Sequence, residues 1–195
     1  MAELYNKVLL NFGQKILTIF KALKKFLITG PRCVHLQLKE NGHQNLKQNN
    51  LNNKFVYLIS PNKIKNDNFY TDLALVFSSK KVSFFQLRLK KETDKSRLII
   101  GKKIKAICKK YKVKFLINDD PILAKKLNAD GCHLGQKDMS IHEARKILSN
   151  KIIGVTCHNS VNLAKKAIDS GADYLAFGGF YSSKTKIIKY KANLK

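Results

Sequence analysis

The chain has 195 residues, enough for one sizeable hydrophobic core and too few for two large domains. Its hydrophobic fraction of 44% is typical of a globular protein, and no apolar run reaches the roughly 18 residues of a membrane span. The net charge of +25 comes mainly from lysines spread along the chain, so we expect anionic small-molecule substrates rather than a nucleic-acid partner.

Three segments differ in pattern. Residues 1–38 are apolar at helical spacing with interspersed lysines, which predicts an amphipathic helical extension that packs against the protein or, alternatively, touches a membrane surface or an import receptor. Residues 39–53, KENGHQNLKQNNLNN, have no periodicity that could bury a face and are interpreted as a linker. Residues 54–195 are predicted to form the main domain.

Short apolar runs alternate with helical stretches through the main domain. The expected strands are 54–60, 84–90, 114–119, 131–135, 152–158 and 173–179, and the expected helices are around 67–79, 97–111, 121–128, 140–149 and 162–170. This order predicts a parallel sheet with helices outside it, in either a doubly wound fold or a (β/α)8 barrel.

Polar residues on one parity of the strands favour the barrel. In FFQLRLKK, Gln86, Arg88 and Lys90 alternate with apolar neighbours, and Thr156 and His158 share a face of a later strand. A doubly wound sheet is covered on both sides, whereas a barrel turns such groups towards a ligand at its C-terminal mouth.

Acidic and basic residues near the strand ends suggest the chemistry. Asp119 and Asp138 follow consecutive strands and could share one Mg²⁺, with Arg88, Lys90 and Lys186 opposite them to bind pyrophosphate oxygens. Each residue also has a simpler interpretation, because an aspartate after a strand is often a helix cap and a lysine is usually solvated.

Other reactive residues are open to two interpretations. In FGGFYSSKTK (177–186), Ser183 and Thr185 could hold a phosphate, or the segment could be an ordinary turn. His133 and His158 could carry protons or be structural. The four cysteines, which form no CxxC motif, are expected to be reduced thiols in the cytoplasm. They are Cys33, Cys108, Cys132 and Cys157.

Five ordered motifs, FQLRLK, INDD, ADGCHLGQKD, IGVTCH and ADYLAFGGFYSSKTK, resemble thiamine-phosphate synthase, also called thiamine-phosphate pyrophosphorylase. The resemblance covers about 55–186 and is closest to the alphaproteobacterial branch. It implies a TIM-barrel transferase that joins hydroxymethylpyrimidine diphosphate to a thiazole phosphate and releases pyrophosphate. The implied cofactor is Mg²⁺.

The resemblance also implies roles for individual residues. Gln86, Arg88, Lys90 and Asn118 would bind the pyrimidine diphosphate, and Asp119 and Asp138 would hold Mg²⁺. Thr156 would supply a substrate-binding hydroxyl in place of the family's frequent serine. The family's T-x-T-K phosphate loop corresponds to Ser183, Lys184, Thr185 and Lys186. Arg88, Lys90 and Lys186 are the expected catalytic cations.

The chain departs from this family after the phosphate loop. The family continues through two more β/α units, so we expect a C-terminally truncated barrel of about six units with two unpaired sheet edges, a condition that closure by a homo-oligomer would relieve. One alternative is a thiazole tautomerase-like paralogue, which the retained Gln136 and Asp138 argue against. The other is an inactive basic barrel fragment that acts as a binding module.

Overall fold

The computed structural model describes residues 35–38 and 56–178, and of residues 35–38 only the backbone. Within these residues, six parallel strands alternate with five helices, as the sequence predicts. The parallel strands are β2 (Val56–Ile59), β3 (Val82–Leu87), β4 (Lys114–Asn118), β5 (Gly131–Leu134), β6 (Ile152–His158) and β7 (Tyr174–Phe177). The helices are α3 (Asn68–Ser78), α4 (Asp94–Lys110), α5 (Pro121–Lys126), α6 (Ile141–Leu148) and α7 (Val161–Asp169).

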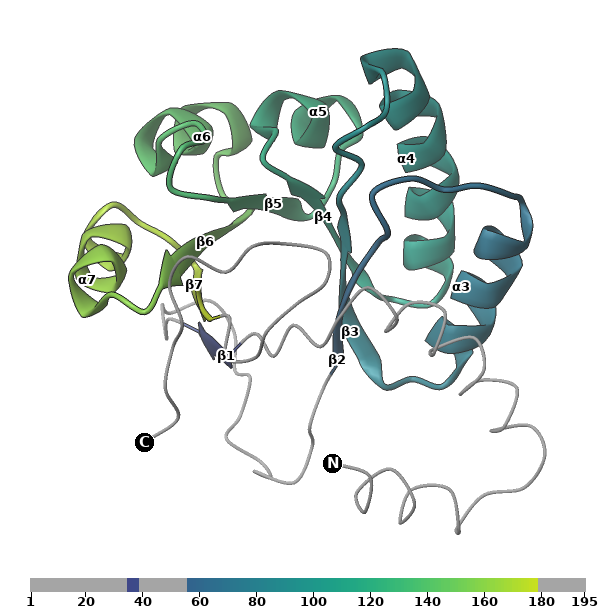
Figure 1. Ribbon diagram of the computed structural model, residues 1–195, viewed down its shortest axis with the longest axis horizontal. Helices are drawn as coiled ribbons and strands as arrows, with labels where there is room; N and C mark the ends of the chain where they lie inside the picture. The colour runs from purple at the N-terminus through teal and green to yellow at the C-terminus, as the bar shows by residue number, and fades with distance from the viewer. Residues whose placement is uncertain (1–34, 39–55, 179–195) are drawn as a thin grey trace, which may run out of the picture.

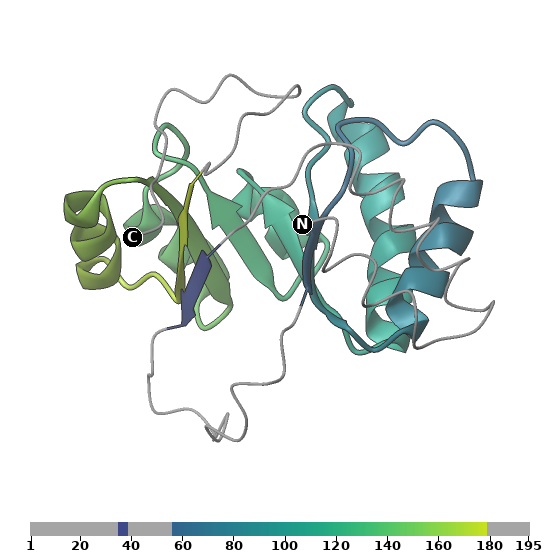
Figure 2. The same cartoon turned by 60° about the horizontal axis from the view of Figure 1, so that its bottom comes forward.

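The strands follow their chain order in space, from β2 at one end to β7 at the other. Figure 1 shows the sheet curving while α3 to α7 form an arc along its convex side. Figure 2, a turned view, shows the same helices on the outside of the strands. A sheet with helices on one side and in-order parallel strands is a half-barrel, so the predicted TIM-type architecture is confirmed and the doubly wound alternative is wrong.

The expected helical extension over 1–38 differs at its last four residues. His35–Leu38 form strand β1, which pairs antiparallel with β7 in the register His35 to Phe177. β1 therefore covers the β7 end of the six parallel strands and becomes the end strand there. Among the described residues β1 pairs only with β7, and β2 at the other end pairs only with β3. The remainder of the expected extension and the 39–53 linker lie outside the described residues.

Strand parity divides the buried side chains into two layers. Phe85 faces outwards and meets Phe77 of α3 with ring centroids 5.7 Å apart, in a continuous core between sheet and helices. The neighbouring Gln86 is also buried, but it faces the concave side together with Leu116 and Tyr174. The inner layer is therefore partly polar, as the alternation in FFQLRLKK predicts.

Side-chain caps begin four of the helices directly after the strands or their loops. Each cap oxygen accepts the backbone N–H of the residue three positions on, which satisfies a donor that the helix itself leaves unpaired. The four caps are Thr93, Asp120, Ser140 and Ser160. These caps fix the loops at the C-terminal edge of the sheet, where the predicted site lies.

None of the helices in the described part of the chain has the length and apolar character needed to cross a bilayer.

Candidate active site

Arg88 and Lys90 follow β3 rather than lying in it, because the strand ends at Leu87 instead of continuing to residue 90. The Arg88 backbone N–H donates to Ser60 Oγ over 2.8 Å, and its guanidinium donates to Asn62 Oδ1. Burial lowers the pKa of Arg88, and the Asp119 charge opposes this shift. The cation is therefore held at the sheet edge by residues that follow β2.

Asp119 lies directly beyond β4 in a left-handed backbone conformation, with φ of 64°. Non-glycine residues rarely adopt this conformation, and such strain is concentrated at functional sites. The Asp119 N–H donates to the carbonyl of His133 over 2.8 Å, and Lys90 Nζ lies 2.8 Å from Asp119 Oδ2. Burial alone would raise the pKa of Asp119, but hydrogen bonds from Lys90, Asp138 and Asn118 outweigh it and keep this pKa below its usual range.

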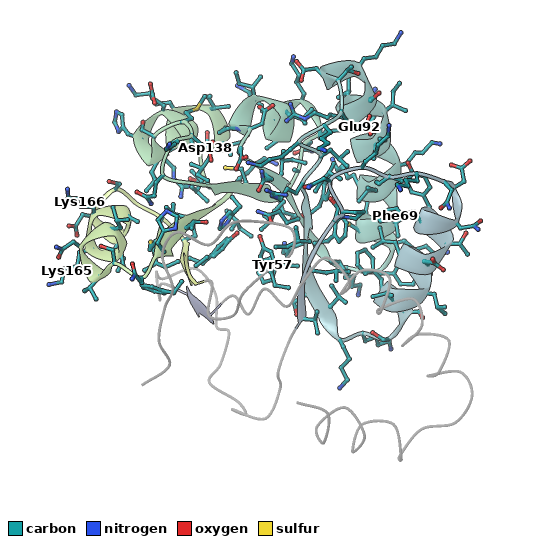
Figure 3. All side chains as sticks on the ribbon, viewed as in Figure 1. Tyr57, Phe69, Glu92, Asp138, Lys165 and Lys166 are labelled. Atoms are coloured by element: carbon teal, nitrogen blue, oxygen red, sulfur yellow. The ribbon has the colours of Figure 1, made fainter. Side chains whose placement is uncertain are left out.

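The carboxyl group of Asp138 meets that of Asp119, as predicted for residues after adjacent strands. Desolvation raises the pKa of Asp138; the Gly135 N–H, which donates to Oδ2 over 2.7 Å, opposes that shift, and the Asp119 charge adds to it. A Cβ on Gly135 would lie 2.9 Å from the same oxygen, so glycine permits this close approach. Figure 3 shows Asp138 beside the loop that leads into α6.

These two carboxylates fit a magnesium site. Mg²⁺ is commonly bound by one or two carboxylates together with substrate phosphates and water, and this chain brings two carboxylates together at one strand edge. No cluster of three or more histidine, cysteine, aspartate or glutamate side chains suited to a metal occurs among the described residues.

The helix-cap interpretation applies to the neighbouring Asp120 instead of Asp119. Asp120 Oδ1 accepts the Leu123 N–H over 2.8 Å at the start of α5, and its Oδ2 accepts Arg97 Nη2 over 2.8 Å. Arg97 also binds Asp94 over 2.9 Å. Of the two consecutive aspartates, Asp120 therefore caps α5 and anchors the loop, whereas Asp119 belongs to the site.

Gln86 carries a buried side-chain amide nitrogen, Nε2, that lacks a hydrogen-bond partner among the described residues. The residue as a whole is 2% exposed. A buried amide without a partner costs about 1 to 3 kcal/mol, so such groups in native proteins call for an explanation. A ligand on the concave side of β3 would supply the missing acceptor.

Gln136, in the turn after β5, meets Thr156 of the neighbouring strand β6 at the same edge. Gln136 Nε2 donates to the Thr156 carbonyl over 2.5 Å, and Thr156 Oγ1 lies 2.8 Å from His133 Nε2. His133 also contacts the hydroxyl of Tyr174, so it has hydrogen-bond partners on both ring nitrogens. His158 ends β6 with a φ of 53°, and its carbonyl accepts the Gly178 N–H.

A cavity of about 350 Å³ is lined on one side by Asp119. It lies between the sheet and helices α4 and α5, and both apolar and charged side chains line it. Lys90 and Asp119 belong to both the cavity and the carboxylate site. The lining residues are Leu87, Leu89, Lys90, Glu92, Arg97, Ile117, Asn118, Asp119, Asp120 and Leu123.

Sequence reasoning missed several residues that support the site. Ser60 and Asn62 follow β2 directly and hold Arg88, so their position after a strand was a usable signal. Tyr174 contacts His133 and Arg97 contacts Asp120, in both cases across a sequence separation that no local pattern indicates. The predicted phosphate-loop residues Ser183, Lys184, Thr185 and Lys186 lie outside the described residues, as does Cys33. The remaining cysteines, Cys108, Cys132 and Cys157, are free and buried, as expected.

Comparisons with known proteins show the family to which this chain belongs. The family described as thiamine monophosphate synthase matches residues 56–195. The chain belongs to this family. A thiamine-phosphate synthase from Pelagibacter ubique is 78% identical over 149 residues, which cover 76% of this chain and 72% of that protein. One from Marinobacter nauticus is 51% identical over 102 residues, which cover 52% of this chain and 46% of that protein.

A solved structure has the same fold. Thiamine phosphate pyrophosphorylase from Pyrococcus furiosus aligns with a TM-score of 0.60 and 28% identity, covering 70% of this chain and 66% of that one. The chain thus spans between about half and three quarters of the length of these relatives. The resemblance to thiamine-phosphate synthases is confirmed. The relatives support the synthase function and do not support the tautomerase or binding-fragment alternatives.

Proposed function

We propose that this protein joins 4-amino-2-methyl-5-hydroxymethylpyrimidine diphosphate to thiazole phosphate, releasing pyrophosphate and forming thiamine phosphate, with Mg²⁺ as cofactor. The observation that carries the proposal is the convergence of Arg88, Lys90, Asn118, Asp119 and Asp138 at one edge of the half-barrel. Family membership and the names of the relatives support it.

The proposed chemistry needs charge stabilisation more than proton transfer. The bond between the pyrimidine methylene carbon and the diphosphate oxygen breaks, and its electron pair leaves with pyrophosphate. The nitrogen of the thiazole then donates its lone pair to the resulting cation to form the new carbon–nitrogen bond. Arg88 and Lys90 would stabilise the leaving diphosphate, with Lys186 as a third cation.

The other residues would bind and orient the substrates. The unpaired Gln86 amide would bind the pyrimidine diphosphate with Asn118, and Thr156 would add a hydroxyl. Asp119 and Asp138 would hold Mg²⁺, which when bound neutralises charge on the diphosphate. The segment Ser183, Lys184, Thr185 and Lys186 would bind phosphate. We also propose a cytoplasmic location, consistent with free thiols at the three described cysteines.

The test is Mg²⁺-dependent release of pyrophosphate by the purified chain with both substrates, compared with reactions lacking one substrate or the metal. Asp119→Ala should abolish turnover, and the matched control Asp169→Ala, on the exposed surface of α7, should retain it. Turnover that survives Asp119→Ala would overturn the metal assignment. Salt-sensitive retention on polyanions without any turnover would favour the binding-module alternative.

A further inference from the structure

A continuous series of polar contacts crosses the concave side of the half-barrel. The hydroxyl of Tyr57 lies 2.8 Å from that of Tyr174, which lies 2.8 Å from His133 Nδ1. His133 Nε2 then lies 2.8 Å from Thr156 Oγ1. The series joins four strands, β2, β7, β5 and β6, and it ends at the proposed substrate-binding hydroxyl. Figure 3 shows Tyr57 on the concave side of the sheet.

The geometry of Tyr174 is fixed by packing. Its side chain is 2% exposed, and its ring stacks on the His133 ring with centroids 5.6 Å apart. A Cβ on Gly154 would lie 1.8 Å from Tyr174 Cζ and 2.3 Å from its hydroxyl oxygen. The tyrosine therefore reaches His133 only because the neighbouring strand carries a glycine at this position.

Both phenols at the end of the series are neutral at physiological pH. Burial raises the pKa of Tyr174 and of Tyr57, and in Tyr174 the neighbouring Tyr57 adds to the shift. A neutral phenol both donates and accepts one hydrogen bond, and a neutral imidazole has one nitrogen that donates and one that accepts. A neutral His133 ring therefore allows two directions for the protons, one for each tautomer.

The two directions give Thr156 opposite properties. If Tyr174 donates to His133 Nδ1, then Nε2–H donates to Thr156 Oγ1, and the hydroxyl proton of Thr156 is free to donate elsewhere. In the reverse direction the Thr156 hydroxyl donates its proton to His133 Nε2, so that only its lone pairs face the ligand. Lone pairs repel an anionic diphosphate, whereas a hydroxyl proton binds its oxygens. The first direction is the one that suits the ligand.

We propose that Tyr174 is a positioning residue that acts through His133 to hold the Thr156 hydroxyl as a hydrogen-bond donor towards the diphosphate. This inference rests on the proposed function, in which Thr156 contacts the substrate. It assigns His133 a fixed tautomer with the proton on Nε2, instead of a role as proton carrier.

The tautomer is measured directly by ¹⁵N NMR of the histidine rings in the full chain without ligand. The expected wild-type signal is a neutral His133 ring with the proton on Nε2. In Tyr174→Phe the donor to Nδ1 is lost, so the signal should move towards a mixture of tautomers. The matched control Tyr111→Phe, at the end of α4, should leave it unchanged. A wild-type ring with the proton on Nδ1 would overturn the proposal, and this measurement needs no variant to fold.

Binding of inorganic pyrophosphate with Mg²⁺, followed by calorimetry, tests the effect on the ligand. Tyr174→Phe and Thr156→Val should each raise the Kd about five-fold, the effect of about one hydrogen bond. The double variant should bind no more weakly than Thr156→Val alone. Multiplied effects in the double variant would mean that Tyr174 does not act through Thr156. The proposed function can fail while this inference stands. That would be the result if the chain showed no turnover, yet His133 carried its proton on Nε2 and the double variant bound pyrophosphate no more weakly than Thr156→Val.

Discussion

The Nζ of Lys90 lies 2.8 Å from Oδ2 of Asp119, so the cation proposed for the diphosphate contacts the carboxylate proposed for the metal ion. Oδ2 of Asp119 cannot bind the Lys90 ammonium and Mg²⁺ at full strength at the same time. Binding of Mg²⁺ therefore competes with Lys90, and a diphosphate that accepts the freed ammonium would relieve this competition. The two proposed ligands should consequently favour one another's binding.

Replacing Lys90 separates these two effects. In Lys90→Ala the affinity for Mg²⁺ alone should rise by up to about five-fold, because a half-exposed ion pair is worth at most about 1 kcal/mol. The affinity for pyrophosphate in the presence of Mg²⁺ should fall. Calorimetric titration measures both constants, and Lys91→Ala, an exposed neighbour, is the control. An unchanged Mg²⁺ affinity would mean that the ion pair does not compete with the metal.

Gly154 offers a test of packing inside the half-barrel. An alanine Cβ would lie 1.8 Å from Tyr174 Cζ, and the ring is fully enclosed and unable to give way. Gly154→Ala should lower the free energy of unfolding by about 2 kcal/mol, as overpacked core variants do. Urea denaturation measures this change.

The control for this variant is Gly101→Ala. Its Cβ would also approach a neighbour, at 2.5 Å, but that neighbour is the end of the flexible Leu127 side chain. The added helix propensity of alanine within α4, about 1 kcal/mol, further offsets the contact. Equal decreases in the free energy of unfolding of Gly154→Ala and Gly101→Ala would show that the Tyr174 ring is free to move.

Several parts of this structure follow from the sequence because they depend on local pattern. Strand parity places Gln86 inside and Phe85 outside, and the order of apolar runs gives the parallel half-barrel. The meeting of Asp119 and Asp138 follows as well, because adjacent parallel strands end at the same edge. These inferences need only the alternation of side chains within each strand and the order of the strands along the chain.

Other features depend on contacts between distant segments, which no local pattern encodes. The pairing of β1 with β7 and the contact between Tyr57 and Tyr174, 117 residues apart, belong to this class. The strand predicted over 84–90 ends at Leu87 in the structure, where the Arg88 backbone N–H donates to Ser60 Oγ instead of to a strand carbonyl. Such boundaries are set by side-chain partners that become visible only in three dimensions.

A repeated aspartate clasp at the opposite edge of the sheet should be important for stability. In the segments 128–131 (NADG) and 171–174 (GADY), the aspartate before each strand binds the preceding strand through both its backbone and its side chain. Asp130 accepts the Phe115 N–H over 2.9 Å. Asp173 accepts the Ile153 N–H over 2.7 Å and also Arg145 Nη2 over 2.7 Å.

Loss of the clasp should destabilise the fold without changing the site. Asp173→Ala should cost about 2 to 3 kcal/mol, because it leaves the Ile153 N–H without a partner and removes the carboxylate that faces the Arg145 guanidinium. Asp130→Ala should cost less, since its second partner is the mainly exposed Lys114. Urea denaturation gives both values, with Asp169→Ala as control. Pyrophosphate binding by the folded fraction should stay unchanged, and a larger loss for Asp130→Ala would contradict this ranking.

The buried thiols give a prediction of pH dependence. Burial raises the pKa of Cys132 to about 12, and it also raises those of Cys108 and Cys157. The thiolate is the nucleophile, so these cysteines should react with iodoacetamide at pH 8.5 far more slowly in the folded chain than in urea. Peptide mass spectrometry resolves each site separately.

The same shift in Cys132 links its thiol to stability. Between the unfolded thiol pKa of about 8.5 and the folded value of about 12, the folded state binds more protons than the unfolded state. The free energy of unfolding should therefore decrease as pH rises through this window, and Cys132→Ala should make that decrease shallower. Urea denaturation of both proteins at pH 8, 9 and 10 measures the slopes. Equal slopes would mean that Cys132 has the same pKa in both states.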